Sequence, residues 1–255
     1  MTRIFAIAIN TWREAIRDRI YLALLGFAAL LILASQVLSP LALGEGTRIT
    51  RDFGLSGLVL VSLLVTIFVG TGLVQKEIER KTVMTILSKP IGRGEFVLGK
   101  YLGLLMTLAV IFIAMTALLL AVLALRGDGF NQPVLLAALL SLGEIVIMTG
   151  VAIFFSTCTS PMLSGMMTLA VFVAGHFTAD LNAFAEQAAS PLLAGLTAAL
   201  HWIFPNLELF NARNAAAHGV MPEAVRFSLG AGYALLYTAA ILLGSIVIFR
   251  RREFR

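Results

Sequence analysis

Long apolar runs separated by short polar segments make up most of the chain. Five of these runs are long enough to cross a membrane as helices, at residues 20–43, 53–75, 101–125, 132–155 and 228–249. A shorter sixth run, 161–179, contains no Asp, Glu, Lys or Arg. A transmembrane helix needs about 20 mainly apolar residues, whereas strands of a membrane barrel would alternate apolar and polar positions. The pattern therefore predicts an all-α integral membrane protein with six transmembrane helices in one domain.

The composition supports a membrane protein and excludes several other classes. Of the 255 residues, 59% are hydrophobic and 13% charged, against about 25% charged residues in a typical soluble domain. A soluble fold of this size would have too few charged side chains to cover its apolar residues. The net charge of +5 does not indicate nucleic acid, because Lys and Arg in a membrane protein mainly mark cytoplasmic loops. We expect membrane lipids, and no nucleic acid, around this chain.

The distribution of basic residues predicts which way the helices run. With six spans and a cytoplasmic N-terminus, most of the 19 Lys and Arg residues lie on the cytoplasmic side. The stretch 188–205 competes as a seventh span, but its apolar part between Pro191 and Pro205 has the length of a re-entrant or interfacial segment. A seventh span would also carry the arginines of the C-terminal tail across the membrane. We therefore expect both termini in the cytoplasm, and short re-entrant or outer helices within an outer loop at 180–227.

The first 19 residues have the pattern of an amphipathic helix. Phe5, Ile9, Trp12 and Ile16 share one face at helical spacing. Most of the charged side chains of this segment fall on the other side. This pattern predicts an interfacial helix along the cytoplasmic membrane surface; the alternative is a basic flank that only sets the topology.

The cytoplasmic loop at 76–100 is rich in charge and contains a second short helical pattern. A run of charged residues follows the second span directly and ends it, because charges are costly in the bilayer core. Val83, Ile86 and Leu87 then share one helical face, and Pro90 ends the pattern. Such a helix is well placed to dock a soluble partner, although periodicity alone equally allows a membrane-surface helix without one.

Three segments together resemble one family. Residues 79–82 (Glu-Arg-Lys-Thr), 86–93 (Ile-Leu-Ser-Lys-Pro-Ile-Gly-Arg) and the pair Gly99 and Lys100 resemble the cytoplasmic loop of ABC-2 type permeases. These permeases are the membrane subunits of bacterial ATP-driven exporters, and the loop carries their coupling helix. The segment 7–19 is similar to the family's N-terminal interfacial helix, and 204–211, with its Pro-Asn pair, resembles a segment of the last outer loop. Lys81 departs from the commonest pattern, which has glycine before the threonine.

The resemblance implies a permease subunit without an ATPase site of its own. Two copies of a separate ATPase subunit would bind ATP and Mg, and a second permease copy would complete the pathway as a homodimer or heterodimer in the bacterial cytoplasmic membrane. The residues implied in ATPase coupling are Glu77, Glu79, Arg80, Lys81, Thr82, Val83, Ile86, Leu87, Ser88, Lys89, Pro90 and Arg93. The resemblance implies no catalytic residue, cofactor or metal in this chain. Residues 94–101 match a phosphate-loop pattern except at Tyr101, where that motif needs Ser or Thr.

Glu144 is the one ionisable carboxylate within the six predicted spans. Intramembrane ionisable groups are functional candidates, so Glu144 is a candidate residue of the transport pathway; it could instead be protonated or hydrogen-bonded between helices. An ion-coupled secondary transporter would need paired repeats and several intramembrane polar groups. A membrane-embedded enzyme would need a reactive cluster, and its only candidates, Glu144 and His176, fall on different predicted spans. Both alternatives are therefore less favoured than the exporter.

Overall fold

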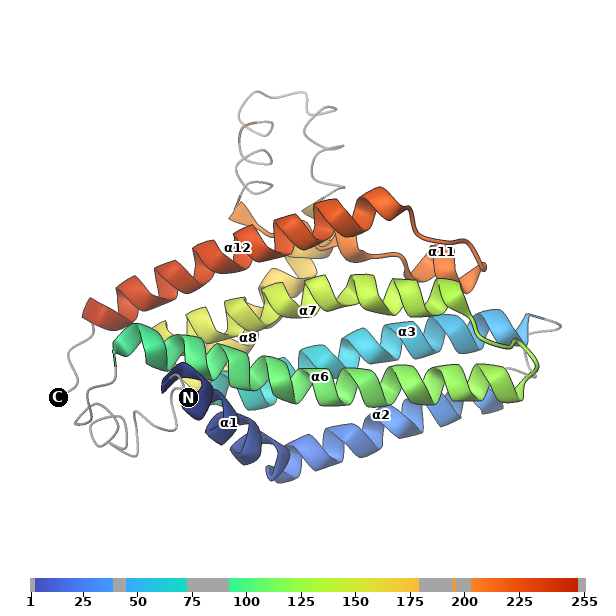
Figure 1. Ribbon diagram of the computed structural model, residues 1–255, viewed down its shortest axis with the longest axis horizontal. Helices are drawn as coiled ribbons and strands as arrows, with labels where there is room; N and C mark the ends of the chain where they lie inside the picture. The colour runs from blue at the N-terminus through green and yellow to red at the C-terminus, as the bar shows by residue number, and fades with distance from the viewer. Residues whose placement is uncertain (1–2, 39–44, 73–91, 179–194, 196–202, 252–255) are drawn as a thin grey trace.

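The computed structural model describes residues 3–38, 45–72, 92–178, 195 and 203–251. These residues form a bundle of helices and the turns that connect them (Figure 1). The helices are α1 (Arg3–Ile16), α2 (Arg19–Leu38), α3 (Gly46–Val65), the π-helix η2 (Thr66–Gly70) that continues α3, α6 (Arg93–Leu125), α7 (Gln132–Cys158), α8 (Pro161–His176), the 3₁₀ turn η3 (Glu208–Phe210), α11 (Arg213–Ala217) and α12 (Ala224–Arg251). The prediction of an all-α protein is confirmed for these residues.

Five of the described helical segments are long and apolar enough to cross a membrane. They are Arg19–Val37, Gly46–Gly70, Arg93–Leu125, Gln132–Cys158 and Ala224–Arg250. The sixth predicted span corresponds to α8, which is apolar but only 16 residues long within the described part of the chain. The fold is therefore that of a multi-pass membrane protein with five span-length helices and one shorter apolar helix.

Two helices begin earlier than their apolar runs do. α3 begins at Gly46 and not at residue 53, and the two arginines of its first turns, Arg48 and Arg51, form ion pairs with Glu45 and Asp128. Arg51, for example, donates to both carboxylate oxygens of Asp128 from Nη2, at 2.6 and 2.7 Å. α6 begins at Arg93 and not at residue 101, and the Glu95 carboxylate accepts a hydrogen bond from the Gly92 N–H at 2.8 Å at its start. Hydropathy marks the apolar core of a helix and not its charged ends.

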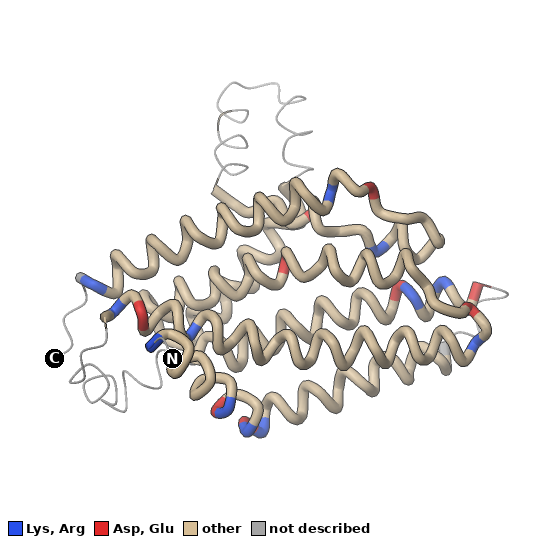
Figure 2. Tube along the Cα trace, viewed as in Figure 1, with Lys and Arg blue, Asp and Glu red and all other residues tan. Residues whose placement is uncertain are grey.

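Charged residues gather at the two ends of the elongated bundle and leave its middle almost free of them (Figure 2). At one end, the start of α6 meets the end of α12, since Arg93 Nη1 donates to the carbonyl oxygens of Phe249 and Arg250. At the other end, the start of α3 meets the end of α6 through Arg51 and Asp128. We call these the Arg93 end and the Arg51 end.

The helices differ sharply in how much of their surface is buried. The apolar windows of α7 and of α3 with η2 are each 67% buried, against 22% for α2 and 28% for α12. α7 and α3 therefore form the interior, while α2 and α12 expose large apolar side chains such as Leu30 and Leu236. Exposed apolar faces of this extent are what lipid-contacting helices require.

α1 packs closely across the start of α6. A Cβ atom on Gly99 would lie 2.6 Å from Ile7 Cβ, and one on Gly103 would lie 2.7 Å from the Ala8 carbonyl oxygen. The close helix approach that Gly99 and Gly103 would allow is therefore present. The helix predicted at the N-terminus is confirmed over Arg3–Ile16, but its buried face is Ala8, Thr11 and Ala15. The predicted bulky stripe lies beside this face, with Phe5 exposed, so it stays available for the membrane surface.

Candidate functional site

Most of the residues predicted to couple to an ATPase lie outside the described part of the chain. These are Glu77, Glu79, Arg80, Lys81, Thr82, Val83, Ile86, Leu87, Ser88, Lys89 and Pro90. The structure therefore leaves the predicted coupling helix untested. Arg93, which follows this segment, is described.

Arg93 joins the start of α6 to the end of α12. Its Nη1 donates to the Phe249 carbonyl oxygen at 3.1 Å and to the Arg250 carbonyl oxygen at 2.8 Å. A guanidinium in this place satisfies terminal carbonyls of α12 and complements the negative end of that helix. One turn further along α6, Phe96 stacks on Phe249 with ring centroids 5.5 Å apart. A displacement of the start of α6 would therefore be transmitted to the end of α12 through these contacts.

Glu144 lies in the bundle interior on α7, with its side chain 1% exposed. Its Oε1 is 3.3 Å from His176 Nε2 at the end of α8, yet neither carboxyl oxygen has a hydrogen-bond partner of good geometry. A small void of about 10 Å³ is lined by Glu144 together with Thr66 and Phe172. Because a buried carboxyl without such partners is costly, this position is a candidate functional site and not an ordinary packing position.

His176 connects Glu144 to a chain of polar groups that comes from a distant part of the sequence. Its Nε2 lies 3.1 Å from Arg213 Nη2. Arg213 Nε in turn donates to Asn211 Oδ1 at 3.0 Å, and Asn211 Nδ2 donates to both carboxylate oxygens of Glu208 at 3.2 and 3.1 Å. These five side chains form a polar relay from the bundle interior to η3 and α11.

The segment at residues 203–217 holds this relay in place, and we refer to it as the 203–217 segment. The Leu207 N–H donates to the Gly175 carbonyl oxygen at 3.1 Å, and the Asn206 N–H donates to the Tyr233 hydroxyl at 2.8 Å. Phe210 is fully buried against Gly143 and Gly230, where any other residue would introduce a Cβ in close contact with its ring. The segment contains only the short elements η3 and α11, and the remainder of the predicted outer helices lies outside the described residues.

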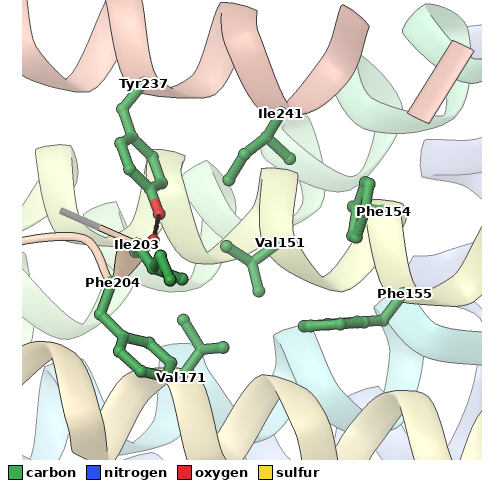
Figure 3. A pocket seen from close by; sticks show the side chains of 8 residues that line it. All are labelled: Val151, Phe154, Phe155, Val171, Ile203, Phe204, Tyr237 and Ile241. Carbon is green, nitrogen blue, oxygen red and sulfur yellow. Dashed lines mark hydrogen bonds between the residues drawn. The ribbon is translucent and has the colours of Figure 1, made fainter. Parts of the chain in front are cut away.

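An apolar cavity of about 240 Å³ lies beside the 203–217 segment, between α7, α8 and α12 (Figure 3). It is lined by Val151, Phe154, Phe155, Val171, Ile203, Phe204, Tyr237 and Ile241. The Tyr237 hydroxyl points toward Ile203 and donates to its carbonyl oxygen at 3.0 Å. This hydrogen bond is a further link between α12 and the 203–217 segment.

The sequence identified two members of the relay, Glu144 and His176, and missed the other three. Glu144 was identifiable as a charge within a span, and His176 was correctly placed on another helix, but the structure brings the two side chains together. Arg213, Asn211 and Glu208 reach them only through tertiary folding of the 203–217 segment, for which no sequence periodicity gives a signal. No group of three or more His, Cys, Asp or Glu side chains that could hold a metal occurs among the described residues.

Five span-length helices and a buried carboxyl group on one of them define a multi-pass membrane protein with a polar site in its interior. The sequence matches the family described as ABC-2 family transporter protein over residues 5–254. The chain therefore belongs to the ABC-2 transporter family, over nearly its whole length, and the resemblance drawn from its loop segments is confirmed. Comparison with curated proteins gives no match.

Proposed function

We propose that this chain is the permease subunit of an ATP-driven exporter and that it couples to a separate ATPase subunit. The observation that carries the proposal is the family match over residues 5–254. ABC-2 permeases generally lack a catalytic ATPase domain of their own, so ATP and Mg would bind to the partner. Two ATPase copies and a second permease copy would complete the transporter in the bacterial cytoplasmic membrane.

The proposed topology has six spans with both termini in the cytoplasm. It takes α8 as the fifth span and the Arg93 end as the cytoplasmic end. The position of α1 supports this orientation, because it packs against the start of α6 and leaves Arg13 and Arg17 exposed. Basic residues are retained on the cytoplasmic side of membrane proteins.

The proposed ATPase contact is the segment that precedes Gly92, with Val83, Ile86, Leu87 and Pro90 in a groove of the ATPase and the charged residues around it. The Arg93 contacts refine the role of that residue. Arg93 and Phe96 join α6 to α12. We therefore assign to Arg93 the transmission of movement from the coupling segment to α12, in addition to a place among the charged residues around the ATPase contact.

The proposal is tested by co-purification with candidate ABC ATPase subunits from the same genome. Ile86→Asp or Leu87→Arg should abolish association or the stimulation of ATP hydrolysis, because either change puts a charge on the apolar face. Thr85→Arg is the matched control, since helical spacing places residue 85 on the opposite face. Unchanged association and coupling in both variants of the apolar face would contradict the proposed contact.

Glu144 is the proposed polar group of the pathway. Glu144→Gln should impair ATP-driven export while leaving the assembled complex and its stability within about 1 kcal/mol of the parent, since the carboxyl oxygens lose no hydrogen bond. The measurement is export by reconstituted complex alongside its unfolding midpoint. Export at the parent rate would remove Glu144 from the pathway.

A further inference from the structure

Two groups approach the same nitrogen of His176. Arg213 Nη2 lies 3.1 Å from Nε2, and Glu144 Oε1 lies 3.3 Å from it. The other ring nitrogen, Nδ1, lies 3.0 Å from the Phe172 carbonyl oxygen. Both ring nitrogens therefore have polar neighbours, and two groups, Arg213 and Glu144, lie within reach of Nε2.

The chemistry of these partners assigns the protons on the ring. A carbonyl oxygen can only accept, so Nδ1 carries a hydrogen and donates it to Phe172. A guanidinium can only donate, so Nε2 presents its single lone pair to Arg213. His176 is thus neutral in this arrangement, and no hydrogen on Nε2 is left for Glu144, which agrees with the unpartnered carboxyl oxygens.

We propose that His176 Nε2 is a proton-binding site for which a proton and Arg213 compete, with Glu144 as the acceptor for the protonated state. When a proton from water binds Nε2, it takes the lone pair that accepted the Arg213 hydrogen bond. The new N–H bond then points to Glu144 Oε1, which accepts it. One proton enters, one N–H bond forms, and the hydrogen bond from Arg213 is lost.

The surroundings favour a real exchange between the two states. The charged and titratable groups that face His176 are Glu144 on α7, Arg213 on α11 and Glu208 on η3. η2 contributes the hydroxyl of Thr66 beside the same void, and α12 contributes Tyr233, whose hydroxyl already accepts from Asn206. Arg213 keeps Asn211 as an acceptor after leaving His176, so its departure strands no charge. His176 is 20% exposed, which gives water access that Glu144 lacks.

The consequence of proton binding is release of the 203–217 segment. Two cations, His176 in its protonated form and Arg213, would then face each other where a hydrogen bond had been, and like charges in a low-dielectric site repel strongly. The other contacts of the segment include the hydrogen bonds of Asn206 and Leu207, the Arg51 contact to the Ala217 carbonyl oxygen and the Phe210 packing. None of these contacts depends on the protonation of His176. The site therefore links proton occupancy to docking of the segment, and it does so whether or not an ATPase is bound.

The ring protons are measured directly by ¹⁵N NMR of the full chain in lipid nanodiscs. The chain contains three histidines, so His176→Gln identifies the His176 signals by subtraction. The expected spectrum at neutral pH has a protonated Nδ1 and an unprotonated Nε2, and acidification should protonate Nε2. A hydrogen on Nε2 at neutral pH would overturn the proposal, because Arg213 could not then donate to it.

Docking of the 203–217 segment is measured by the rate at which a water-soluble thiol reagent labels a buried cysteine in it. Ala212→Cys, in a chain whose own exposed Cys158 is replaced by serine, reports on a buried position of the segment. Its rate is divided by that of Asn214→Cys, an exposed neighbour that corrects for the effect of pH on thiol reactivity. From about pH 8 to about pH 5 the ratio should rise by about tenfold or more, the change expected from losing a charge-assisted hydrogen bond.

Two variants separate this mechanism from general acid loosening. Gln at position 176 can still accept from Arg213 but cannot take up a proton, so His176→Gln should keep the ratio low at every pH. Arg213→Gln removes the competitor, so its ratio should be high already at neutral pH and independent of pH. The proposal would be overturned if the labelling ratio rose on acidification as much in the His176→Gln chain as in the parent. It would also be overturned if His176 became protonated without any change in the ratio.

Discussion

Two interfaces within this bundle, here called seams, are formed by residues of opposite character. The seam between α1 and α6 is made of Gly99 and Gly103 on one helix and of Ile7, Ala8 and Thr11 on the other. The seam between the 203–217 segment and α7, α8 and α12 contains a large buried aromatic, Phe210, together with the polar relay. The first seam has no ionisable group among the residues that meet at its glycines, whereas the polar relay of the second contains four, Glu144, His176, Glu208 and Arg213.

This difference indicates which parts of the protein move together. Contacts through glycine allow close backbone approach and tolerate almost no displacement, so α1 and α6 should behave as one body. The polar seam depends on which hydrogen bonds its side chains can make, and those depend on proton occupancy. The comparison therefore predicts a fixed seam near the Arg93 end and a releasable one around Glu144, and substitutions can break either.

The largest effect should come from filling the fixed seam. Gly103→Leu would place its side chain against Thr11 and the Ala8 carbonyl oxygen, which is backbone and cannot turn away. We expect a loss of about 3 kcal/mol of unfolding free energy, as for severe overpacking, measured as the denaturation midpoint in detergent. Gly26→Leu on α2 is the matched control, because a Cβ there meets nothing within 4 Å. Equal midpoints for the two variants would show that the seam is not close-packed.

A smaller effect is expected at the Arg51 end, where the releasable seam is anchored a second time. Arg51 pairs with Asp128 through two nitrogens and also donates from Nη1 to the Ala217 carbonyl oxygen at 3.4 Å. Arg51→Ala should cost about 2 kcal/mol, because it leaves a partly buried carboxylate without its main partner. Arg51→Lys should retain part of this free energy, since a single ammonium cannot reproduce the bidentate geometry. The double variant Arg51→Ala, Asp128→Ala completes the comparison. If its loss of unfolding free energy equals the sum of the losses in the two single variants, the pair is not coupled.

The smallest effect on stability should come from Arg93, where the functional effect is larger than the structural one. Arg93→Ala removes a C-terminal cap from α12 and should cost about 1 kcal/mol in the denaturation midpoint. It should also weaken the stimulation of ATP hydrolysis in the proposed complex, because the link from α6 to α12 is lost. Arg93→Lys, which keeps the charge, is the control. Full stimulation in Arg93→Ala would contradict the transmission role.

Hydropathy alone was sufficient to predict the five span-length helices, because a run of about 20 apolar residues has few alternatives in a bilayer. The apolar runs begin later than α3 and α6 do, because the first turns of these helices are charged. Among those charges, Arg51 finds its partner Asp128 only in the folded bundle. Glu144 was identifiable because a charge within a span is rare. The partners of His176 and Arg93 were not, since each lies far away in sequence and is selected by helix packing. The family resemblance identified the class of protein, and local patterns could not identify its internal contacts.

Cysteines in place of two buried alanines distinguish a fixed seam from a releasable one. Ala8 lies in the α1–α6 seam and Ala212 in the 203–217 segment, and both are almost fully buried. Ala8→Cys and Ala212→Cys, each in a chain with Cys158 replaced by serine, are labelled with a water-soluble thiol reagent from about pH 8 to about pH 5 and referred to an exposed cysteine. We expect labelling of residue 212 to rise by about tenfold or more on acidification while residue 8 stays protected. Equal protection of both residues at every pH, or equal labelling of both in acid, would contradict this expectation.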